Sequence, residues 1–545
     1  MIAEERHTET EEIRIETDVL VIGGGFTGVK AAAEIADLGY KVTLAEKDAN
    51  VGTLREPRSL LGLDEEAYRG LQDTVYQVNK GGKVEVMTGT GLAGVEGVSG
   101  DFSVKLSAGD AVTERKFGSI VVANDFVASP LNGKYNLELS DTVLSQKQLE
   151  ILLADNKAQL KDKTIAFLVG LGQEGNPVVM ERVFQSVLAV QDQGCAVYVY
   201  TGDLKVAGDG LDRLYKEGRD QGASYFKLME IPEVSPDGQQ ITFHDPVLRR
   251  DVEVTPDLVV VEEEILADEA NAELAEMLRI DLGGAGFLQS DNVHFFPVRS
   301  NREGIFLAGA SRDVQSLSIA LADAGNVALE VANFLGDGTK IVPTDKAVVD
   351  PRKCVICLTC YRCCPHGAIY WEDNRAVISP VACQGCGICA SECPQDAIQI
   401  GAFKDDAIKT QIGEALADPD GNPRIVAFCC ENSAFEAGQM AEEFKMQLPA
   451  GFRKIKVPCA GKVDLDYIMT ALADGADGVL VMACHTGNCK SERGNIYAGW
   501  RVEDAHRMME EAGFDKSRLV FATIAANMGS EFVRIVTDME KNINK

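Results

Sequence analysis

The chain has 545 residues, of which 46% are apolar and 25% are charged, a composition typical of a soluble globular protein with several domains. Its 84 acidic and 53 basic residues give a formal net charge of −31, which argues against a nucleic-acid binder because phosphate recognition depends on concentrated Lys and Arg. Since an apolar run of about 18 residues and a secretory signal are both missing, we expect no transmembrane helix, no direct membrane insertion and a cytoplasmic location.

The first predicted unit is a dinucleotide-binding fold that opens with a β-branched strand over 17–22. The strand runs into the glycine turn GGGFTG at 23–28, which is followed by an Ala-rich helix over 29–38. A second strand over 41–44 ends at Glu46. A strand, GxGxxG, a helix, a strand and an acid within about 30 residues are typical of a dinucleotide site.

Each position of this pattern has a physical task. Gly23 makes the tight turn, Gly25 lets the backbone approach a pyrophosphate, and Gly28 lets the helix pack on the strand. Glu46 is placed to accept hydrogen bonds from the adenosine ribose hydroxyls. The alternative is a glycine turn without a ligand.

A second glycine turn, GLGQEG at 170–175, follows a strand over 164–169 and precedes a helical stretch that ends near 193. It predicts either an NAD(P)H site or a degenerate nucleotide fold, within about 160–290, that only packs against the first. We favour the degenerate fold because Glu174 would place a carboxylate near any phosphate and no acid directly ends the next strand.

The stretch GIFLAG at 304–309 is a short strand that precedes a helix from about 316 to 334. It resembles the second flavin-contacting segment of two-dinucleotide-fold flavoproteins, so Gly309 is a further candidate cofactor contact. Ala310 stands where that family has Asp, and backbone N–H groups at the start of the helix would replace its contact. We therefore assign residues 1–340 to an FAD-binding domain that includes the second fold.

The fifteen cysteines are distributed unevenly: one lies in the first 353 residues, nine between 354 and 393, and five between 429 and 489. The middle group contains two runs of C-x2-C-x2-C-x3-C-P, the spacing of bacterial two-cluster ferredoxins. In these runs the fourth cysteine ligates the other cluster. Residues 341–402 therefore predict a ferredoxin domain with two [4Fe–4S] clusters, and this spacing is not that of a zinc finger.

The crossed pattern gives two sets of ligands, called here the first and the second ferredoxin set. The first ferredoxin set is Cys354, Cys357, Cys360 and Cys393. The second ferredoxin set is Cys383, Cys386, Cys389 and Cys364. Cys363 and Cys195 are interpreted as thiols without a ligand role.

Residues 403–423 predict a linker helix and turn, and 424–545 an open parallel α/β domain. Three of its predicted strands end in cysteines, with another cysteine shortly after the last of them; these are Cys429, Cys430, Cys459, Cys484 and Cys489. Ligands in open parallel sheets bind beyond the carboxyl ends of the strands, so the thiols would converge on one crevice. A [2Fe–2S] cluster is the simplest occupant, with a structural zinc site or unligated thiols as alternatives.

The order of these parts resembles the A subunits of heterodisulfide reductases. The motifs FCCEN, VPCAGKVD and GADGVLVMACHTGNC in the last 120 or so residues resemble the delta subunit of methyl-viologen-reducing hydrogenase. The fused arrangement is most similar to the B subunits of quinone-interacting membrane-bound oxidoreductase complexes of sulfate reducers. One departure is Ser433, which stands where the delta subunits commonly have a cysteine.

The resemblance implies FAD, two [4Fe–4S] clusters and a third cluster as cofactors. It also implies a second flavin subunit and a haem- and quinone-binding membrane subunit as partners, together with a soluble adenylylsulfate reductase. The chain would then be an electron-transfer oxidoreductase subunit in sulfate respiration, active only within a complex and peripheral to the membrane through its partners. Its chemistry would be that of its cofactors, without a catalytic side chain.

Two other functions stay open. One is a flavin-based electron-bifurcating subunit partnered with a hydrogenase or formate dehydrogenase. The other is a non-catalytic electron-transfer adaptor whose first domain holds no flavin.

Overall fold

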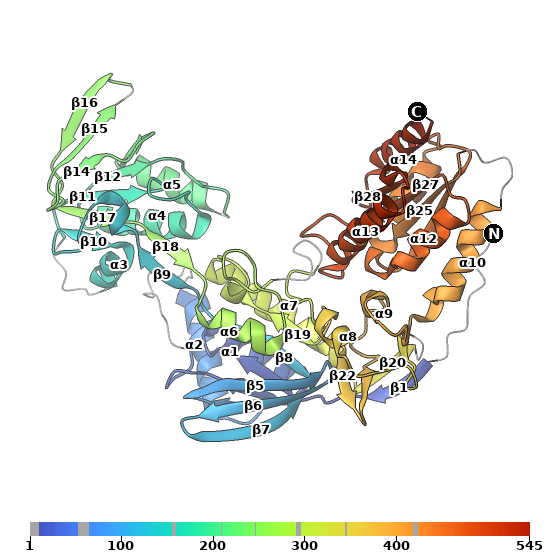
Figure 1. The fold of residues 1–545 in the computed structure, drawn as a ribbon. Coiled ribbons are helices and arrows are strands. Elements are labelled where there is room, and N and C mark those ends of the chain that lie inside the picture. The colour runs from blue at the N-terminus through green and yellow to red at the C-terminus, as the bar shows by residue number, and fades with distance from the viewer. Residues whose placement is uncertain are drawn as a thin grey trace.

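The structure is a computed structural model that describes residues 10–52, 65–154, 160–208, 210–245, 247–289, 296–343, 346–417 and 423–544. It confirms the predicted fold class, an α/β multidomain protein with a two-dinucleotide-fold region, a ferredoxin domain and a C-terminal parallel sheet (Figure 1). No helix in the described part of the chain is both long enough and apolar enough to cross a membrane.

The first nucleotide fold is built on a five-stranded parallel sheet in the order β19-β8-β2-β3-β4. Its strands are β2 (Val19–Ile22), β3 (Val42–Ala45), β4 (Val84–Met87), β8 (Ser119–Val122) and β19 (Ile305–Leu307). Strands β2, β3, β8 and β19 are buried along their whole length, as expected for short β-branched strands covered on both faces. Helices α1 (Phe26–Asp37) and α7 (Leu317–Leu335) pack on one face, beside α2 (Glu65–Lys80).

The other face of this sheet is covered by the antiparallel strands β5 (Thr90–Val98), β6 (Asp101–Ala108) and β7 (Ala111–Phe117) and by helix α6 (Ala270–Leu278). The edge of the region is formed by β1 (Thr10–Arg14), which pairs antiparallel with β20 (Thr339–Pro343). Strand β20 lies where the first nucleotide fold leads into the ferredoxin domain, so the start of this connection is held by a sheet.

The second nucleotide fold is inserted into the first between β9 (Val127–Pro130) and β18 (Glu263–Leu266), which pair antiparallel with each other. Its parallel sheet has the order β10-β17-β11-β12-β13. These strands are β10 (Val143–Ser145), β11 (Thr164–Val169), β12 (Ala196–Thr201), β13 (Ser224–Lys227) and β17 (Leu258–Val261). They are joined by α3 (Gln146–Ala154), α4 (Pro177–Gln191) and α5 (Leu211–Asp220), and by a small antiparallel sheet of β14 (Glu233–Val234), β15 (Ile241–Asp245) and β16 (Arg250–Val254).

The ferredoxin domain consists of two antiparallel strand pairs and two short helices that carry cysteines. One strand pair is β21 (Val348–Val349) with β24 (Ile398–Gln399), and the other is β22 (Ile369–Glu372) with β23 (Arg375–Ile378). The helices are α8 (Thr359–Cys363) and α9 (Ile388–Ser391). The two halves of the domain therefore match each other, as the repeated cysteine motif predicts.

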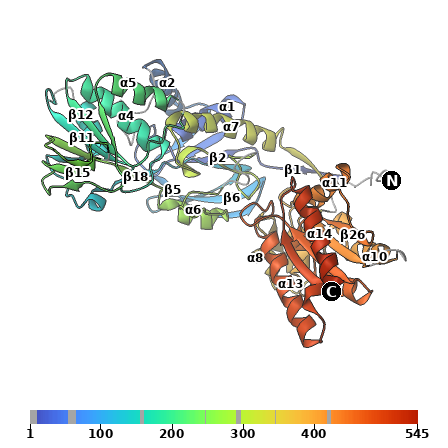
Figure 2. The ribbon, with the colours of Figure 1, turned by 90° about the horizontal axis from the view of Figure 1, so that it is seen from above.

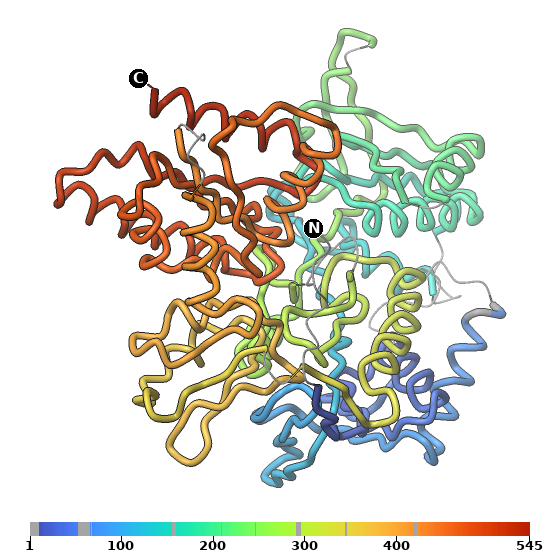
Figure 3. The backbone as a smooth tube through the Cα atoms, turned by 90° about the vertical axis from the view of Figure 1, so that its right-hand side faces the viewer, coloured from blue at the N-terminus to red at the C-terminus, as the bar shows by residue number. Residues whose placement is uncertain are grey.

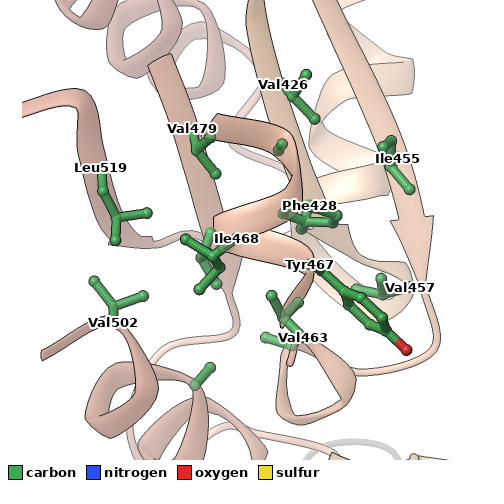
Figure 4. Packing of buried hydrophobic residues seen from close by; sticks show 14 of the residues in the cluster. Val426, Phe428, Ile455, Val457, Val463, Tyr467, Ile468, Val479, Val502 and Leu519 are labelled. Carbon is green, nitrogen blue, oxygen red and sulfur yellow. The ribbon is translucent and has the colours of Figure 1, made fainter. Parts of the chain in front are cut away.

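The C-terminal domain is a four-stranded parallel sheet in the order β26-β25-β27-β28. The strands are β25 (Ile425–Cys430), β26 (Phe452–Val457), β27 (Gly478–Ala483) and β28 (Leu519–Thr523). Helices α10 (Asp405–Leu416), α12 (Leu465–Ala473) and α13 (Gly494–Glu511) cover one face, which Figure 4 shows from close by. Helices α11 (Glu436–Glu443) and α14 (Gly529–Ile543) cover the other face.

Helix α10 differs from the linker helix that the sequence predicts. Ile408, Ile412 and Leu416 are buried in the same core cluster as the strands of the C-terminal sheet, so α10 is part of this domain. The turn that follows the helix lies largely outside the described residues, because 418–422 are not described.

The first nucleotide fold lies between the second nucleotide fold and the ferredoxin domain, and the ferredoxin domain adjoins the C-terminal domain (Figure 1). The second nucleotide fold and the C-terminal domain form separate lobes above a base made of the first nucleotide fold and the ferredoxin domain (Figures 1 and 2). A side view keeps this order, with the ferredoxin domain below the C-terminal domain (Figure 3). The ferredoxin domain thus lies between the flavin-type fold and the C-terminal sheet.

Candidate functional site

The first glycine turn opens onto a cavity at the carboxyl ends of β2 and β3. Gly23, Gly25 and Glu46 line this cavity, together with the start of β5 and one side of α6. A Cβ atom on Gly28 would lie 1.9 Å from the backbone oxygen of Gly23, so only glycine allows the helix to pack this closely on the turn. No side chain caps the N-terminus of α1, which leaves the N–H groups of its first turn for the phosphates of a ligand.

Glu46 lies in this cavity, and its carboxylate already accepts hydrogen bonds from the backbone. One carboxylate oxygen accepts a hydrogen bond from the Gly24 N–H, and the other accepts from the Asp48 N–H at 2.7 Å. Each oxygen keeps a second lone pair for a ribose hydroxyl. The residues of the first turn therefore fit the adenosine end of FAD.

A second carboxylate near this turn was not anticipated from the sequence. Asp125, just after β8, lies so close that a Cβ atom on Gly25 would be 2.8 Å from its Oδ2 atom. Asp268 also lines the cavity and pairs with Lys47 at 3.2 Å. The cavity is thus more acidic than a pyrophosphate site requires, and a bound dinucleotide has to coexist with the Asp125 carboxylate.

Gly309 packs against the same helix start from the other side. It has a φ of +61°, and a Cβ atom there would lie 2.9 Å from Thr27 and 3.1 Å from Ala320. The Gly309 N–H donates to Asp323 at 3.1 Å, and Asp323 forms a two-pronged pair with Arg312. Gly309 therefore lets α7 approach α1, while its own N–H already has a partner inside the protein.

The second glycine turn is occupied by a side chain of the protein itself. Glu262, 1% exposed at the end of β17, accepts hydrogen bonds from the N–H of Gly170 at 2.8 Å and of Gly172 at 3.1 Å. The Tyr135 hydroxyl donates to the same carboxylate at 2.6 Å, and burial together with this carboxylate raises the pKa of Tyr135. The turn amides that would bind a phosphate therefore already bind an internal anion.

The first ferredoxin set is brought together at one cavity, which is lined by Cys354, Cys357, Cys360 and Cys393. Burial raises the pKa of Cys360 to about 11, and the three other thiols of the set, Cys393 included, add to this effect. Cys393 therefore lies with the three cysteines of the opposite run.

The second ferredoxin set is gathered in the same way. Burial raises the pKa of Cys389, and the neighbouring thiols Cys386, Cys364 and Cys383 raise it further. Cys364 thus lies with the opposite run. Cys363 lies close to this set as well, since its thiol also raises the pKa of Cys389; it is buried, and its thiol donates to the Cys360 carbonyl at 3.4 Å.

The two cysteine loops share one backbone path. Gly385 and Gly387 in the second loop have φ values of +66° and +82°. The matching positions of the first loop are Ile356 and Leu358, which have φ values of +56° and +58° although they are not glycines. Left-handed backbone in such residues costs free energy and is kept where a site demands the conformation.

In the C-terminal domain, four of the five candidate cysteines meet on the face covered by α10, α12 and α13. The sulfur atoms of Cys430 and Cys484 are 3.7 Å apart. The Cys459 and Cys484 thiols lower the pKa of Cys489, helped by the backbone N–H groups of Asn495 and Ser491. The four residues, Cys430, Cys459, Cys484 and Cys489, belong to one core cluster. They lie at the carboxyl ends of β25, β26 and β27, as the strand-end argument predicts.

The structure separates Cys429 from these four. Side chains alternate along a strand, so Cys430 points to the face of Val426 and Phe428, while Cys429 points to the opposite face among residues packed under α11 and α14. Ser433 lies on the side of the four thiols, where its hydroxyl is buried near Cys484. Across the described residues, no three His, Cys, Asp or Glu side chains are arranged to hold a single metal ion.

Gly494 is a site residue that the sequence analysis missed. It begins α13, and a Cβ atom there would lie 2.2 Å from the Cys459 sulfur and 3.6 Å from the Cys489 sulfur. The start of an 18-residue helix is therefore packed directly against the thiols, where its dipole favours negative charge. The signal available in the sequence was a glycine at the start of a helical pattern shortly after Cys489.

The ferredoxin domain is joined to both of its neighbours by direct hydrogen bonds. Towards the first nucleotide fold, the Asn301 side chain donates to the Pro365 carbonyl at 2.8 Å, and Arg279 donates to the Tyr361 carbonyl at 2.9 Å. Towards the C-terminal domain, Arg501 pairs with Glu392 at 2.6 Å. These contacts place the cysteine loops between the two larger domains.

Three known families match separate parts of the chain. Residues 18–110 match the pyridine nucleotide-disulphide oxidoreductase family, 346–411 the 4Fe-4S dicluster domain, and 425–545 the delta subunit of methyl-viologen-reducing hydrogenase. Among solved structures, thioredoxin reductase from Lactococcus lactis is similar with a TM-score of 0.41 and 16% identity, covering 59% of this chain and 100% of that chain.

Two curated relatives cover different parts of the chain. The A subunit of ferredoxin:CoB-CoM heterodisulfide reductase from Methanosarcina mazei is 31% identical over 355 residues, which is 65% of this chain and 45% of the relative. The chain thus spans less than half the length of that protein. The vhu iron-sulfur D subunit of the F420-non-reducing hydrogenase from Methanocaldococcus jannaschii is 35% identical over 124 residues, 23% of this chain and 92% of the relative.

The second of these matches extends over nearly the whole of a known protein, and the first extends over 65% of this chain. The portion before residue 425 is homologous to the A subunits of heterodisulfide reductases and contains a flavoprotein domain and a 4Fe-4S dicluster domain. Through residues 425–545 the chain therefore belongs to the family of methyl-viologen-reducing hydrogenase delta subunits.

Proposed function

We propose that this protein is an electron-transfer subunit of a multisubunit oxidoreductase, with FAD in the first nucleotide fold, a [4Fe–4S] cluster on each ferredoxin set and a [2Fe–2S] cluster on the C-terminal thiols. The observation that carries the proposal is the position of the ferredoxin domain, which is hydrogen-bonded to the flavin-type fold on one side and to the C-terminal domain on the other. Redox sites in three adjoining domains suit a protein that passes electrons along its length.

The residues of the first fold would bind and orient the flavin. Glu46 would hold the adenosine ribose, and the N–H groups at the start of α1 would receive the pyrophosphate. FAD, when bound, exchanges electrons in pairs or singly, which suits a link between two-electron carriers and one-electron iron–sulfur clusters. The second fold would hold no nicotinamide dinucleotide, because Glu262 already satisfies its turn amides.

Cys430, Cys459, Cys484 and Cys489 would be the ligands of the C-terminal cluster. Four thiolates are a complete set for a [2Fe–2S] cluster, and Cys430 supplies the ligand for which Ser433 offers only a hydroxyl. The N-terminus of α13 would stabilise the negative charge of the cluster and its thiolates.

The matched variants Cys430→Ser and Cys429→Ser test this set of ligands. We expect about ten irons per chain in the native protein and in Cys429→Ser, and about eight in Cys430→Ser, because only Cys430 lies on the side of the other thiols. Iron analysis with spectroscopy of the reduced protein measures the difference. Equal iron in both variants would refute the four-cysteine set.

We further propose that the partners are a second flavin subunit, a haem- and quinone-binding membrane subunit and a soluble reductase such as adenylylsulfate reductase. The support is the resemblance of the fused arrangement to the B subunit of quinone-interacting membrane-bound oxidoreductase complexes. The net charge of −31 suits docking to proteins more than contact with anionic lipid. Purification of the native complex with identification of its subunits tests this proposal, and isolation with unrelated partners would overturn it.

The likeness to the D subunit of a hydrogenase favours a second candidate, an electron-bifurcating subunit that works with a hydrogenase. The same purification separates the two, because a hydrogenase or formate dehydrogenase would replace the membrane protein among the components that are isolated.

A further inference from the structure

The second cysteine loop of the ferredoxin domain is covered by the C-terminal domain. Cys386 packs against the core cluster of that domain. A Cβ atom on Gly387 would lie 2.8 Å from the Lys462 side chain. A Cβ atom on Gly461 would lie 2.6 Å from the Ile388 side chain. The face formed by residues 386–388 is therefore the place where this loop meets another domain.

The repeated cysteine motif places an equivalent face on the first loop. Cys357, Leu358 and Thr359 stand at the positions that match residues 386–388. Cys357 is the only exposed one of the fifteen cysteines, all of which the structure describes. Val355, two residues before it, has an exposed fraction of 61%. The face that the second loop buries against another domain is thus open to solvent in the first loop.

Ile356 in this open face is held in an unfavourable conformation. It has a φ of +56°, where the second loop has Gly385, and its side chain is 38% exposed. Left-handed backbone in a β-branched residue costs free energy, and the exposed part of the side chain gains none from burial. Ile356 and Cys357 also line the cavity of the first ferredoxin set. A protein that contacts these two residues therefore reaches the edge of that cavity.

The first loop is basic although the protein as a whole is acidic. Residues 351–364 contain three cations and no acid, in a chain with a net charge of −31. One of these cations is paired with Asp350 at 2.9 Å. The other two are the exposed side chains of Lys353, which donates to a backbone carbonyl at 3.3 Å, and Arg362, which donates to the Cys357 carbonyl at 3.1 Å. Among the described residues no carboxylate pairs with either of them, so both charges are free to meet an acidic surface.

Proteins that exchange electrons meet through small and transient interfaces, which complementary charges orient. We propose that the open face of the first loop, residues 355–359 with Lys353 and Arg362 beside it, is the docking surface for an acidic one-electron carrier protein. The inference rests on the proposed function, since it gives an external partner to the first ferredoxin cluster. A single electron passes between the carrier and that cluster, and no bond is formed or broken. The C-terminal domain then serves one end of the ferredoxin domain and the carrier serves the other.

The test uses the full-length protein with its clusters and takes flavodoxin, an acidic one-electron carrier, as the probe. The variants are Lys353→Gln and Arg362→Gln, and the matched control is Lys445→Gln, which removes an exposed cation of the C-terminal domain. Calorimetry measures the dissociation constant of the complex with flavodoxin. At low salt we expect it to rise about three- to tenfold in each loop variant and to stay native in the control, and added salt should weaken the native complex.

Cross-linking of carboxylates to amines locates the complex on the protein surface. We expect flavodoxin to be joined to Lys353 and not to Lys445. Failure of flavodoxin to bind, equal weakening in the control, or cross-links that avoid Lys353 would overturn the inference. So would a Lys353 cross-link to a second copy of this chain in place of flavodoxin.

Iron analysis of the same samples keeps the two proposals apart. Protein without ferredoxin clusters would refute the proposed function, whatever its affinity for flavodoxin. Native affinity in cluster-replete Lys353→Gln and Arg362→Gln would refute the docking surface and leave the proposed function intact.

Discussion

The two glycine turns of this protein have the same spacing and opposite environments. Gly23–Gly28 faces a cavity, and its helix N-terminus is uncapped. Gly170–Gly175 is followed by Asn176, whose side chain caps α4 through the Val179 N–H, and its amides are bound to Glu262. The first turn keeps the N–H groups at the start of α1 for a ligand, although its Gly24 N–H is bound to Glu46. In the second turn, the Gly170 and Gly172 N–H groups are bound to Glu262 and the helix start is capped. A GxGxxG motif therefore indicates a fold, while the side chains that approach it from other strands decide whether it binds.

Alanine at the third glycine of each turn should produce the largest difference between the two turns, and the quantity affected is the flavin content. In Gly28→Ala the new Cβ atom meets the Gly23 backbone oxygen, so we expect loss of flavin from the purified protein. In Gly175→Ala it meets only the flexible end of Met180, 2.6 Å away, and the flavin content should stay native. Flavin release and absorbance measure the flavin content of both variants. Full flavin in Gly28→Ala would contradict the assignment of the first turn.

Replacing the internal anion of the second turn should destabilise that lobe. Glu262→Gln puts an amide among the donors of Gly170, Gly172 and Tyr135, which we expect to cost about 1–3 kcal/mol of local stability. Hydrogen exchange in β11 and β17 measures the loss, and Glu264→Gln on the exposed side of β18 is the control. Unchanged protection in Glu262→Gln would show that the carboxylate does not hold the turn.

Glu46→Gln tests the ribose contact at the first turn. The amide keeps the size of the side chain but loses one acceptor, so we expect the dissociation constant of FAD to rise about tenfold, or roughly 1.4 kcal/mol. Titration of the flavin-free protein with FAD measures it. Native affinity in this variant would remove Glu46 from the site.

The smallest effect on FAD affinity is expected at Asp125, where the substitution should strengthen binding. Asp125→Asn removes a negative charge beside Gly25, and FAD should bind a few-fold more tightly because less charge repels its pyrophosphate. The same titration measures it at low and high salt. Weaker binding in Asp125→Asn would mean that the carboxylate helps to hold the flavin.

The fold class, the grouping of each cysteine run with the fourth cysteine of the other run and the convergence of strand-end cysteines could be predicted from the sequence, because spacing and strand ends indicate them. The cysteine runs fix which loops face each other, and alternation along β25 could have separated Cys429 from Cys430. The roles of Glu262 and Asp125 could not be predicted, since both reach glycine turns about 90 to 100 residues away in sequence. Helix α10 was assigned to a linker because the turn at 417–423 breaks its helical pattern, and only the packed sheet shows what the helix covers.

The most direct test of the central claim, that only the first turn binds a dinucleotide, is the cofactor content of the native protein combined with its response to nicotinamide cofactors. We predict about one FAD per chain and neither binding nor oxidation of NADH or NADPH in calorimetry and flavin absorbance. Reduction of the flavin by NADH or NADPH, or purification of cluster-replete protein without flavin, would contradict it.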